Sequence, residues 1–274
     1  MKRLVINADD FGLSESVNRG IVNCLRNGVV SATTMLANFP ASDPALSLVR
    51  RHSIDLGWHV NLTEGKPLSP PGKIPSLVNS QGFFHPLPQL LKKAFLRQLR
   101  RDEICLELSA QFDKVNGEVP ISHLDGHEHV HVFPVIRDAV RDLVEKHRIP
   151  FVRLPAERGG ISIERFPARF FLRSLKGSKA SFWGKGRGLA FYGLSLAPRA
   201  GELKAWSDLL DRIEEDAAEV MVHPGEAAVP GEAYDRFPAS RRKESERLQD
   251  PRLKALLQEK GFEVVSFRDL KNFF

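Results

Sequence analysis

Four segments of the sequence carry acidic and histidine side chains whose types and spacing suit catalysis. In chain order they contain Asp9 and Asp10, His59, the run from His123 to His131, and His223. Two adjacent carboxylates repel each other, and a nearby cation would offset that cost. On an extended chain Asp9 and Asp10 point to opposite sides, so one could bind a cation while the other flanks it. Such a pair can also simply end a strand and cap a helix.

The histidine-rich run is the strongest chemical signal. Four histidines and Asp125 occupy alternate positions between His123 and His131, which places them on one side of a strand and its continuation. The packing of a core gives no reason for such a set, whereas a metal site or a proton-transfer site does. The competing interpretations are a loop that is rich in histidine by chance and, for His59, a hydrogen-bonded core residue.

The elements that would position these residues alternate between strand and helix. Short apolar runs predict strands at Leu4–Ile6, Ser31–Leu36, Ile54–Leu62, Ile121–Asp125, Phe151–Leu154, Glu219–Val222 and Phe262–Phe267. Helical periodicity predicts helices at Ser16–Asn27, Pro44–His52, Lys92–Asn116, Val135–His147, Leu203–Ala217 and Pro251–Lys260. This alternation predicts an α/β protein, an irregular TIM-like (β/α) barrel of about seven parallel strands. The carboxyl ends of the strands form the active face of such a barrel, and the candidate residues lie there.

Two long stretches interrupt the alternation. Residues 64–88 are rich in proline and show no clear period, and residues 157–200 are basic and dotted with glycine. Loops of this length in a compact domain are usually lids or disordered segments. Neither stretch looks like a linker between independent cores. We therefore expect one domain over residues 1–274, with both stretches as insertions.

Composition narrows the class of protein. The chain is 42% hydrophobic and 27% charged, as is typical of globular proteins. It contains no run of eighteen apolar residues, so we expect no membrane-spanning helix. Cys24 and Cys105 give no disulfide framework. The apolar part of the N-terminus is too short for a signal peptide. Together these features predict a cytoplasmic protein.

The net charge of +6 is concentrated in one of the insertions. Between Arg158 and Arg187 eight basic residues are opposed only by Glu164, and phenylalanine and tryptophan are interleaved with them. Such a mixture could bind a phosphate backbone, an anionic membrane surface or an acidic substrate. No nucleic-acid motif accompanies it. A solvated insertion is therefore the simpler interpretation, and nucleic acid is not an expected partner.

Four motifs give the chain a resemblance to a known family. They are NADDFG at Asn7–Gly12, GWHVNL at Gly57–Leu62, HLDGHEHVH at His123–His131 and VMVHP at Val220–Pro224. In this order they resemble the YdjC-type carbohydrate deacetylases, which include chitooligosaccharide deacetylases and a hopanoid-biosynthesis branch. The resemblance covers residues 3 to about 270 and implies an irregular (β/α) barrel with one divalent metal ion. By position, the implied metal ligands are Asp10, His59 and His127. Glu128 stands where the family often has histidine.

The resemblance implies a hydrolase that removes N-acetyl groups from an amino sugar, an oligosaccharide or a glycolipid head group. A divalent cation with an open position activates water and polarises the carbonyl of the amide. In this scheme Asp9 is the candidate general base and His223 the candidate general acid. The other candidates would contact the sugar or support a ligand: Asp125, His129, His131, Asn61 and Trp58. The ligand types suit magnesium, zinc, cobalt, manganese or nickel, and the resemblance favours magnesium.

Two other functions remain open. One is a different metal-dependent hydrolase on the same barrel, which cleaves a phosphoester or another amide. It would need more ligands and a second metal ion, for which Asp125 and His129 are available. The other is a non-catalytic protein that uses the basic insertion to bind nucleic acid or a membrane. The same insertion, residues 158–187, also makes a membrane-associated glycolipid a candidate substrate.

Overall fold

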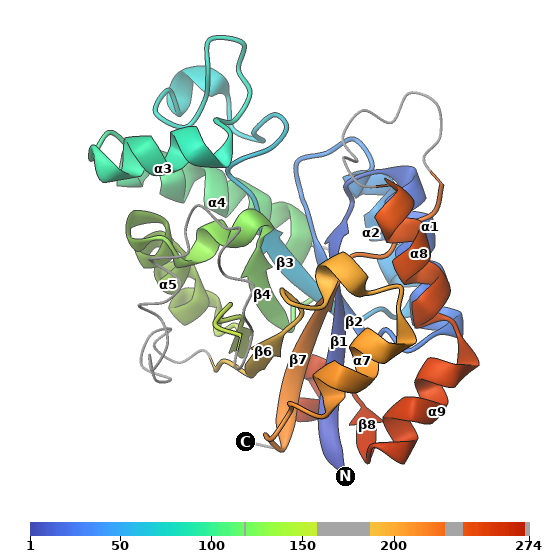
Figure 1. Cartoon of the computed structure of the whole chain (residues 1–274). Helices are drawn as coiled ribbons and strands as arrows, with labels where there is room; N and C mark the ends of the chain where they lie inside the picture. The colour runs from blue at the N-terminus through green and yellow to red at the C-terminus, as the bar shows by residue number, and fades with distance from the viewer. Residues whose placement is uncertain (118, 158–186, 228–237, 272–274) are drawn as a thin grey trace.

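The fold is that of an α/β barrel, as seen in a computed structural model that describes residues 1–117, 119–157, 187–227 and 238–271 (Figure 1). Its strands are β1 (Lys2–Phe11), β2 (Ala32–Met35), β3 (Leu56–Val60), β4 (His123–Gly126), β5 (Phe151–Val152), β6 (Ala190–Tyr192), β7 (Ala217–Val222) and β8 (Phe262–Val264). Its helices are α1 (Glu15–Asn27), α2 (Ser42–His52), α3 (Leu87–Phe95), α4 (Arg101–Asn116), α5 (Pro134–His147), α7 (Leu203–Leu210), α8 (Pro238–Leu248), α9 (Pro251–Glu259) and α10 (Phe267–Leu270). Short 3₁₀ helices occupy Pro71–Lys73, His127–Val132 and Ala197–Arg199.

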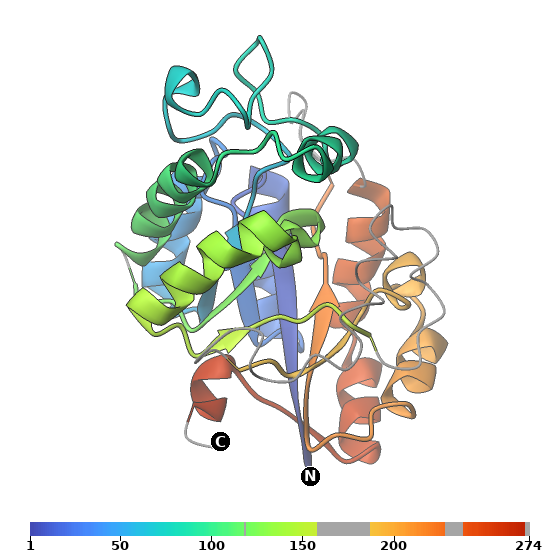
Figure 2. The same ribbon diagram turned by 90° about the vertical axis from the view of Figure 1, so that its left-hand side faces the viewer.

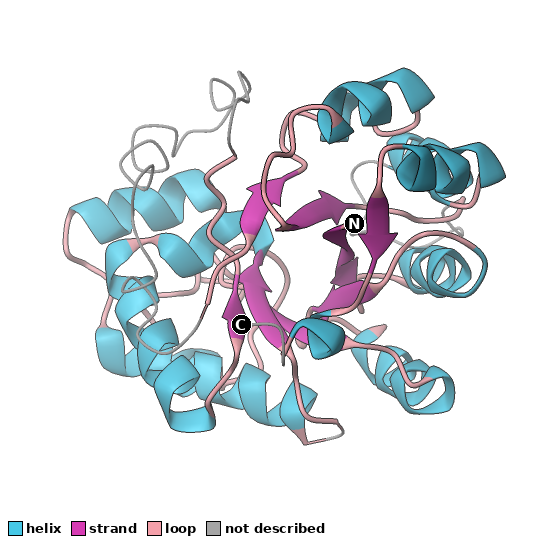
Figure 3. Cartoon of the chain, turned by 90° about the horizontal axis from the view of Figure 1, so that it is seen from below, coloured by secondary structure: helices cyan, strands magenta, loops and turns pink. Residues whose placement is uncertain are grey.

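The sheet is parallel and curls on itself. Its strands are hydrogen-bonded in the order β5-β4-β3-β2-β1-β7-β6, and β8 pairs with the first residues of β1. Arg187 pairs with Phe151 of β5, and the nearby strand β6 pairs with β7. The segment from Arg187 to Tyr192 therefore joins the two edges of the sheet. The long helices lie outside the strands (Figure 3), and β1 rises from the N-terminus through the centre of the molecule (Figure 2). The predicted fold class is confirmed.

Local sequence explains the elements nearest to the candidate residues. The consecutive apolar residues Leu4, Val5 and Ile6 of β1 are all fully buried, as expected where a strand is covered on both faces. Helix α1 is preceded by Ser14, whose side chain accepts a hydrogen bond from the backbone N–H of Val17 and so caps the helix. These two features fix where the chain leaves the carboxyl end of β1.

The side chains inside the barrel change from apolar to polar along its axis. Apolar side chains gather near the amino ends of the strands, where α10 packs against them, and they include Val5, Ala32, Phe151, Ala217, Phe267 and Leu270. Polar side chains occupy the next layers, where Gly57 leaves room for a histidine ring. A Cβ atom at Gly57 would lie 2.5 Å from His123 Nε2, which is too close for any side chain. The polar layers lead up to the carboxyl ends of the strands.

Two of the predicted helices are wrong in extent. The predicted helix Lys92–Asn116 is two helices, α3 and α4, separated by a turn in which Arg97 has a φ of 56°. The predicted helix Leu203–Ala217 ends at Leu210, and Ala217 already belongs to β7. In both cases the apolar periodicity continued across the break, so it gave no signal of the turn. The strand β6 and the helices α8 and α10 were not predicted, and the predicted strand Phe262–Phe267 ends earlier, at Val264.

The first predicted insertion is more ordered than a structureless loop. Residues 64–88 include a 3₁₀ turn, a bridge between Val78 and Phe84, and the fully buried side chains of Ile74 and Leu77. Most of the second insertion, residues 158–186, lies outside the described residues. None of the described helices is long and apolar enough to cross a lipid bilayer.

Candidate metal centre

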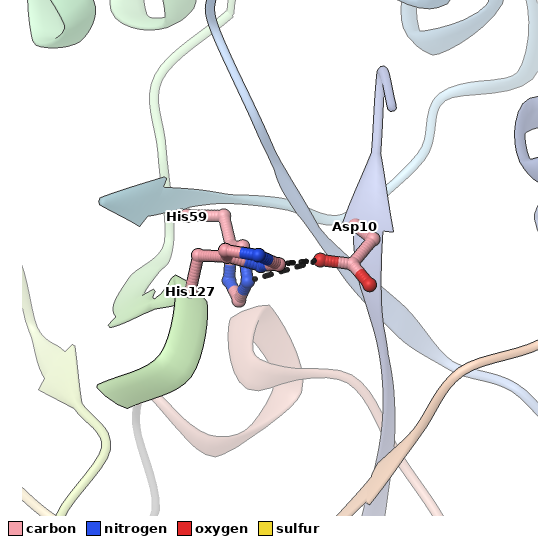
Figure 4. A group of neighbouring side chains, drawn as sticks. All are labelled: Asp10, His59 and His127. Atoms are coloured by element: carbon pink, nitrogen blue, oxygen red, sulfur yellow. Dashed lines mark hydrogen bonds and ion pairs between the residues drawn. The ribbon is translucent and has the colours of Figure 1, made fainter. Parts of the chain in front are cut away.

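Asp10, His59 and His127 meet at the carboxyl ends of β1, β3 and β4 (Figure 4). His127 Nδ1 lies 3.0 Å from Asp10 Oδ1, and His59 Nε2 lies 3.4 Å from the same oxygen. One potential ligand atom from each residue lies within 4.8 Å of the others. The side chains of Asp10 and His59 are almost fully buried, whereas that of His127 is 16% exposed. The group is therefore closed on the protein side and reachable from solvent at His127.

Strand β1 is irregular where it supplies the two carboxylates. Its pairing with β2 shifts register between Ala8 and Phe11, and Asp10 has a φ of 69° in the left-handed region. Aspartate tolerates this conformation better than most residues with a side chain. Irregularities of this kind bend a strand and redirect its side chains, and they are common beside active sites. The bend accounts for how neighbouring residues, Asp9 and Asp10, reach two different parts of the site.

The chemistry of the group fits a divalent cation. One carboxylate oxygen faces two imidazole nitrogens, which is a three-ligand set of the kind that leaves a further position open. Burial disfavours protonation of His59, but the carboxylates of Asp125 and Asp10 outweigh it and raise its pKa to about 9. Burial also opposes protonation of His127, and Asp10 and Glu64 raise its pKa to about 10. The carboxylates of Asp10, Asp125 and Glu64 thus stabilise a positive charge at this point, either as protons on the two imidazoles or as a metal ion.

Each candidate ligand also contacts a second side chain through an atom that does not face the other two ligands. His59 Nδ1 lies 2.6 Å from Asp125 Oδ1, and His127 Nε2 lies 3.0 Å from Glu64 Oε2. Arg241 Nη2 donates to Asp10 Oδ2 at 2.6 Å. Partners of this kind fix the tautomer and orientation of histidine ligands. Because Arg241 binds Oδ2, Oδ1 of Asp10 would be the oxygen that holds an ion. Asp125 was expected in this role, whereas Glu64 and Arg241 were missed.

In a second group of possible ligands, Asp9, His59 and Asp125, the two carboxylates already bind a cation, the guanidinium of Arg153. Arg153 donates to both oxygens of Asp9 at 2.6 and 2.8 Å and lies 2.7 Å from Asp125 Oδ2. It also donates to Glu219 at 2.8 Å. The side chains of all four are at most 3% exposed. The guanidinium is therefore the positive charge among these three carboxylates.

Arg153 and Glu219 were also missed, although a signal existed. Both are charged residues within predicted strands, and a charged residue inside a buried strand needs a partner. Burial raises the pKa of Glu219 to about 7, against the opposing effect of Arg153. The pKa of Asp9 moves the other way: burial would raise it, but Arg153 holds it far below the usual range. Asp9 is consequently ionised throughout the physiological range.

His223 follows β7 and faces Asp9. His223 Nε2 lies 4.0 Å from Asp9 Oδ2, and the His223 side chain is 28% exposed. Burial lowers the pKa of His223, and the nearby Asp9 and Asp10 only partly offset this. The imidazole is therefore neutral at pH 7. Asp9 and His223, predicted as a catalytic pair, lie next to each other beside the candidate metal centre.

The chain is similar to known proteins over almost its whole length. The model of the family described as YdjC-like protein matches residues 3–259. The chain belongs to the YdjC-like family. The carbohydrate deacetylase of Mus musculus is 36% identical, over 98% of this chain and 94% of its own length. That of Geobacillus stearothermophilus is 34% identical, over 97% of this chain and 96% of its own length. The crystal structure of a candidate cellobiose-phosphate cleavage protein of Enterococcus faecalis has a TM-score of 0.82 and 25% identity, with 98% of each chain covered.

His129 and His131, which the YdjC-type motifs also singled out, are both buried. His131 Nε2 donates to the backbone carbonyl of Arg153 at 2.9 Å, and burial lowers its pKa to about 3. His129 is buried, with its ring edge-on to Phe191. Burial also holds the pKa of His129 well below its ordinary value, so both rings are neutral at pH 7.

Trp58 was predicted to contact the sugar or to support a ligand. Its side chain is fully buried and packs edge-on against Phe112 of α4, with ring centroids 5.7 Å apart. Side chains alternate along a strand. Because His59 faces the interior of the barrel, its neighbour Trp58 must face the helices outside.

Asn61 organises the loop that carries Glu64. Its Oδ1 accepts from the backbone N–H groups of Thr63 and Glu64, and its Nδ2 donates to the carbonyl of Glu64 at 2.7 Å. The side chain is fully buried. It was predicted to line a sugar subsite or to support the site, and these contacts fit the supporting role.

Proposed function

We propose that this protein is a divalent-metal-dependent carbohydrate N-deacetylase that hydrolyses the acetamide of an amino sugar. The observation that carries the proposal is the meeting of His59 and His127 on one oxygen of Asp10. Membership of the YdjC-like family and relatives named carbohydrate deacetylase support the same reaction.

Asp10, His59 and His127 would hold the cation. When bound, it supplies a Lewis acid that polarises the acyl oxygen and lowers the pKa of water. Asp125 holds the His59 ring from behind, and Asp125 is itself fixed by Arg153 and by Thr34, whose hydroxyl donates to Asp125 Oδ2 at 3.0 Å. This fixed support keeps the three ligands in position without reorganisation during the reaction.

Asp9 and His223 would accept and donate the protons that hydrolysis moves. Hydrolysis releases a proton from the attacking water, and the departing amine requires one. Asp9 is ionised and accepts the first proton, while the neutral His223, 4.0 Å away, takes it up and delivers it to the amine. The partial exposure of His223 gives a substrate access to this pair.

A single metal ion is expected at this site. A second ion among Asp9, His59 and Asp125 would have to displace Arg153, which already neutralises two of these groups. This argues against a two-metal phosphoesterase on the same barrel. The binding role suggested for the basic insertion concerns residues 158–187, which lie almost entirely outside the described residues.

The test is acetate release from a panel of N-acetylated monosaccharides, chitooligosaccharides and glycolipids. We expect release that stops with chelator and returns with magnesium, zinc, cobalt, manganese or nickel, and the metal that restores it best identifies the cofactor. Asp10→Asn, which keeps the shape of the side chain, should be inactive with every metal. Release that persists in chelator, or hydrolysis of phosphoesters alone, would overturn the proposal.

A further inference from the structure

The turn between α3 and α4 carries an unusual pair of apolar side chains. Phe95 is 87% exposed and Leu96 is 49% exposed, and apart from Met1 these are the largest exposed fractions for large apolar side chains among the described residues. They end α3 just before Arg97, where the chain turns toward α4. Single exposed apolar residues are common on proteins. Phe95 and Leu96 are neighbours, so their exposed surfaces form one small apolar patch at the turn.

Positive charge surrounds this pair. The segment from Lys92 to Arg101 contains five basic residues, Lys92, Lys93, Arg97, Arg100 and Arg101, and no acidic residue. Arg100 and Arg101 pair with Asp102 and Asp142. Within the part of the chain that the structure describes, Lys92, Lys93 and Arg97 form no ion pair. The tip therefore joins an apolar centre to a cationic rim.

We propose that this tip, residues 92–101, docks on an anionic lipid bilayer, with Phe95 and Leu96 entering the interface. Transfer of the apolar side chains at the tip from water to the bilayer interface lowers their free energy. Lysine and arginine beside an anionic bilayer are attracted to its surface. A stable protein interface would need about 800 Å² on each partner, which two side chains on a turn do not provide. A bilayer accepts a small protruding tip of this kind, so the charge and the shape favour a membrane over a protein partner.

The position of α3 means that docking would bring the candidate metal centre close to the bilayer. Helix α3 lies toward the end of the barrel at which the strands finish, the end that also carries the candidate metal centre (Figures 1 and 2). Docking through its tip would hold that end of the barrel near the lipid surface. A sugar carried on a lipid head group would then be within reach. This consequence rests on the proposed function, whereas the docking itself does not.

The experiment is co-sedimentation of the full chain with vesicles of phosphatidylglycerol and phosphatidylcholine, and with vesicles of phosphatidylcholine alone. We expect binding to the anionic vesicles that weakens as salt is added. The double variant Phe95→Ser/Leu96→Ser should bind about tenfold more weakly or worse, because it loses most of the apolar contribution. Leu106→Ser removes another exposed leucine, 42% exposed on α4, and should bind as the original chain does.

A second measurement reports insertion directly. In the Phe95→Trp variant, anionic vesicles should shift the added tryptophan fluorescence to shorter wavelength, and lipids brominated on their acyl chains should quench it. Equal binding by the double variant would overturn the inference, because another basic surface would then make the contact. Absence of binding to anionic vesicles, or fluorescence of the Phe95→Trp variant that they leave unchanged, would do the same. All three outcomes are independent of acetate release, so they leave the proposed reaction standing.

Discussion

Glu64 Oε2 lies 3.0 Å from His127 Nε2, the ring nitrogen opposite the one that faces Asp10. Nε2–H therefore donates to Glu64, and Nδ1 is the nitrogen that would bind a cation after losing its proton. The loop that holds Glu64 is itself fixed from below. Gln111 Nε2 donates to the carbonyl of Asn61 at 2.7 Å, and Asn61 Oδ1 accepts from the backbone N–H of Glu64 at 3.1 Å. A buried polar chain thus links α4 to a candidate ligand.

Removal of the Glu64 carboxylate should weaken metal binding. Outer partners of histidine ligands contribute about 10- to 100-fold to metal affinity, so Glu64→Ala should lose affinity by that factor and Glu64→Gln by less. Isothermal titration of the metal-free protein measures this. Glu246→Ala on the exposed face of α8 serves as the control. Equal affinities for Glu64→Ala and the control would show that this contact does not position His127.

Metal binding should release protons. The pKa values of about 9 for His59 and about 10 for His127 mean that both rings are protonated in the metal-free protein at pH 7. Each ring must lose a proton before it can bind a metal ion, so about two protons should leave per ion. The apparent affinity should therefore rise as the pH increases toward 9. Titration calorimetry in buffers of different ionisation enthalpy counts the protons, and a count near zero at pH 7 would contradict the assignment.

Loss of Arg153 should damage the fold itself. Arg153→Met would leave Asp9, Asp125 and Glu219 buried without their cation, and breaking a buried ion pair on one side costs about 3–5 kcal/mol. Urea unfolding of the metal-free protein measures the loss. The same substitution at Arg242, whose pair with Glu246 is exposed, should cost less than about 1 kcal/mol. Similar losses at the two positions would argue against a structural role for the buried cluster.

His223 should affect turnover without affecting the metal. General acid–base groups contribute about 10²- to 10⁴-fold, so His223→Ala should lower kcat by that factor and leave metal affinity unchanged. Because burial lowers the pKa of His223 below its ordinary value of 6.5, the ring is neutral at pH 7 and takes up a proton only as the pH falls further. At saturating metal, kcat/KM should decline below about pH 6.5. A kcat for His223→Ala within about threefold of the original would remove His223 from the mechanism.

The sequence predicted the barrel and the ends of its strands because those features depend on local patterns. The apolar run Leu4–Ile6 and the polar residues directly after it mark both a buried strand and its functional end. Strand alternation also predicts that Trp58, next to the inward-facing His59, points outward toward the helices, where it packs against Phe112.

Other parts of the site depend on contacts that no local pattern encodes. Arg241 reaches Asp10 across 231 positions of the chain, and Glu64 lies in a loop whose course is fixed by Asn61 and Gln111. The break between α3 and α4 falls at Arg97, which adopts a left-handed backbone without the glycine that would have signalled it. Such features emerge only when distant segments pack together.

The most direct test of the account is the number of metal ions bound per chain, measured by elemental analysis after reconstitution and set against acetate release. We predict one ion in the original chain, release in proportion to occupancy, and neither ion nor release in Asp10→Asn. Two ions per chain, or full release from a chain without metal, would contradict it.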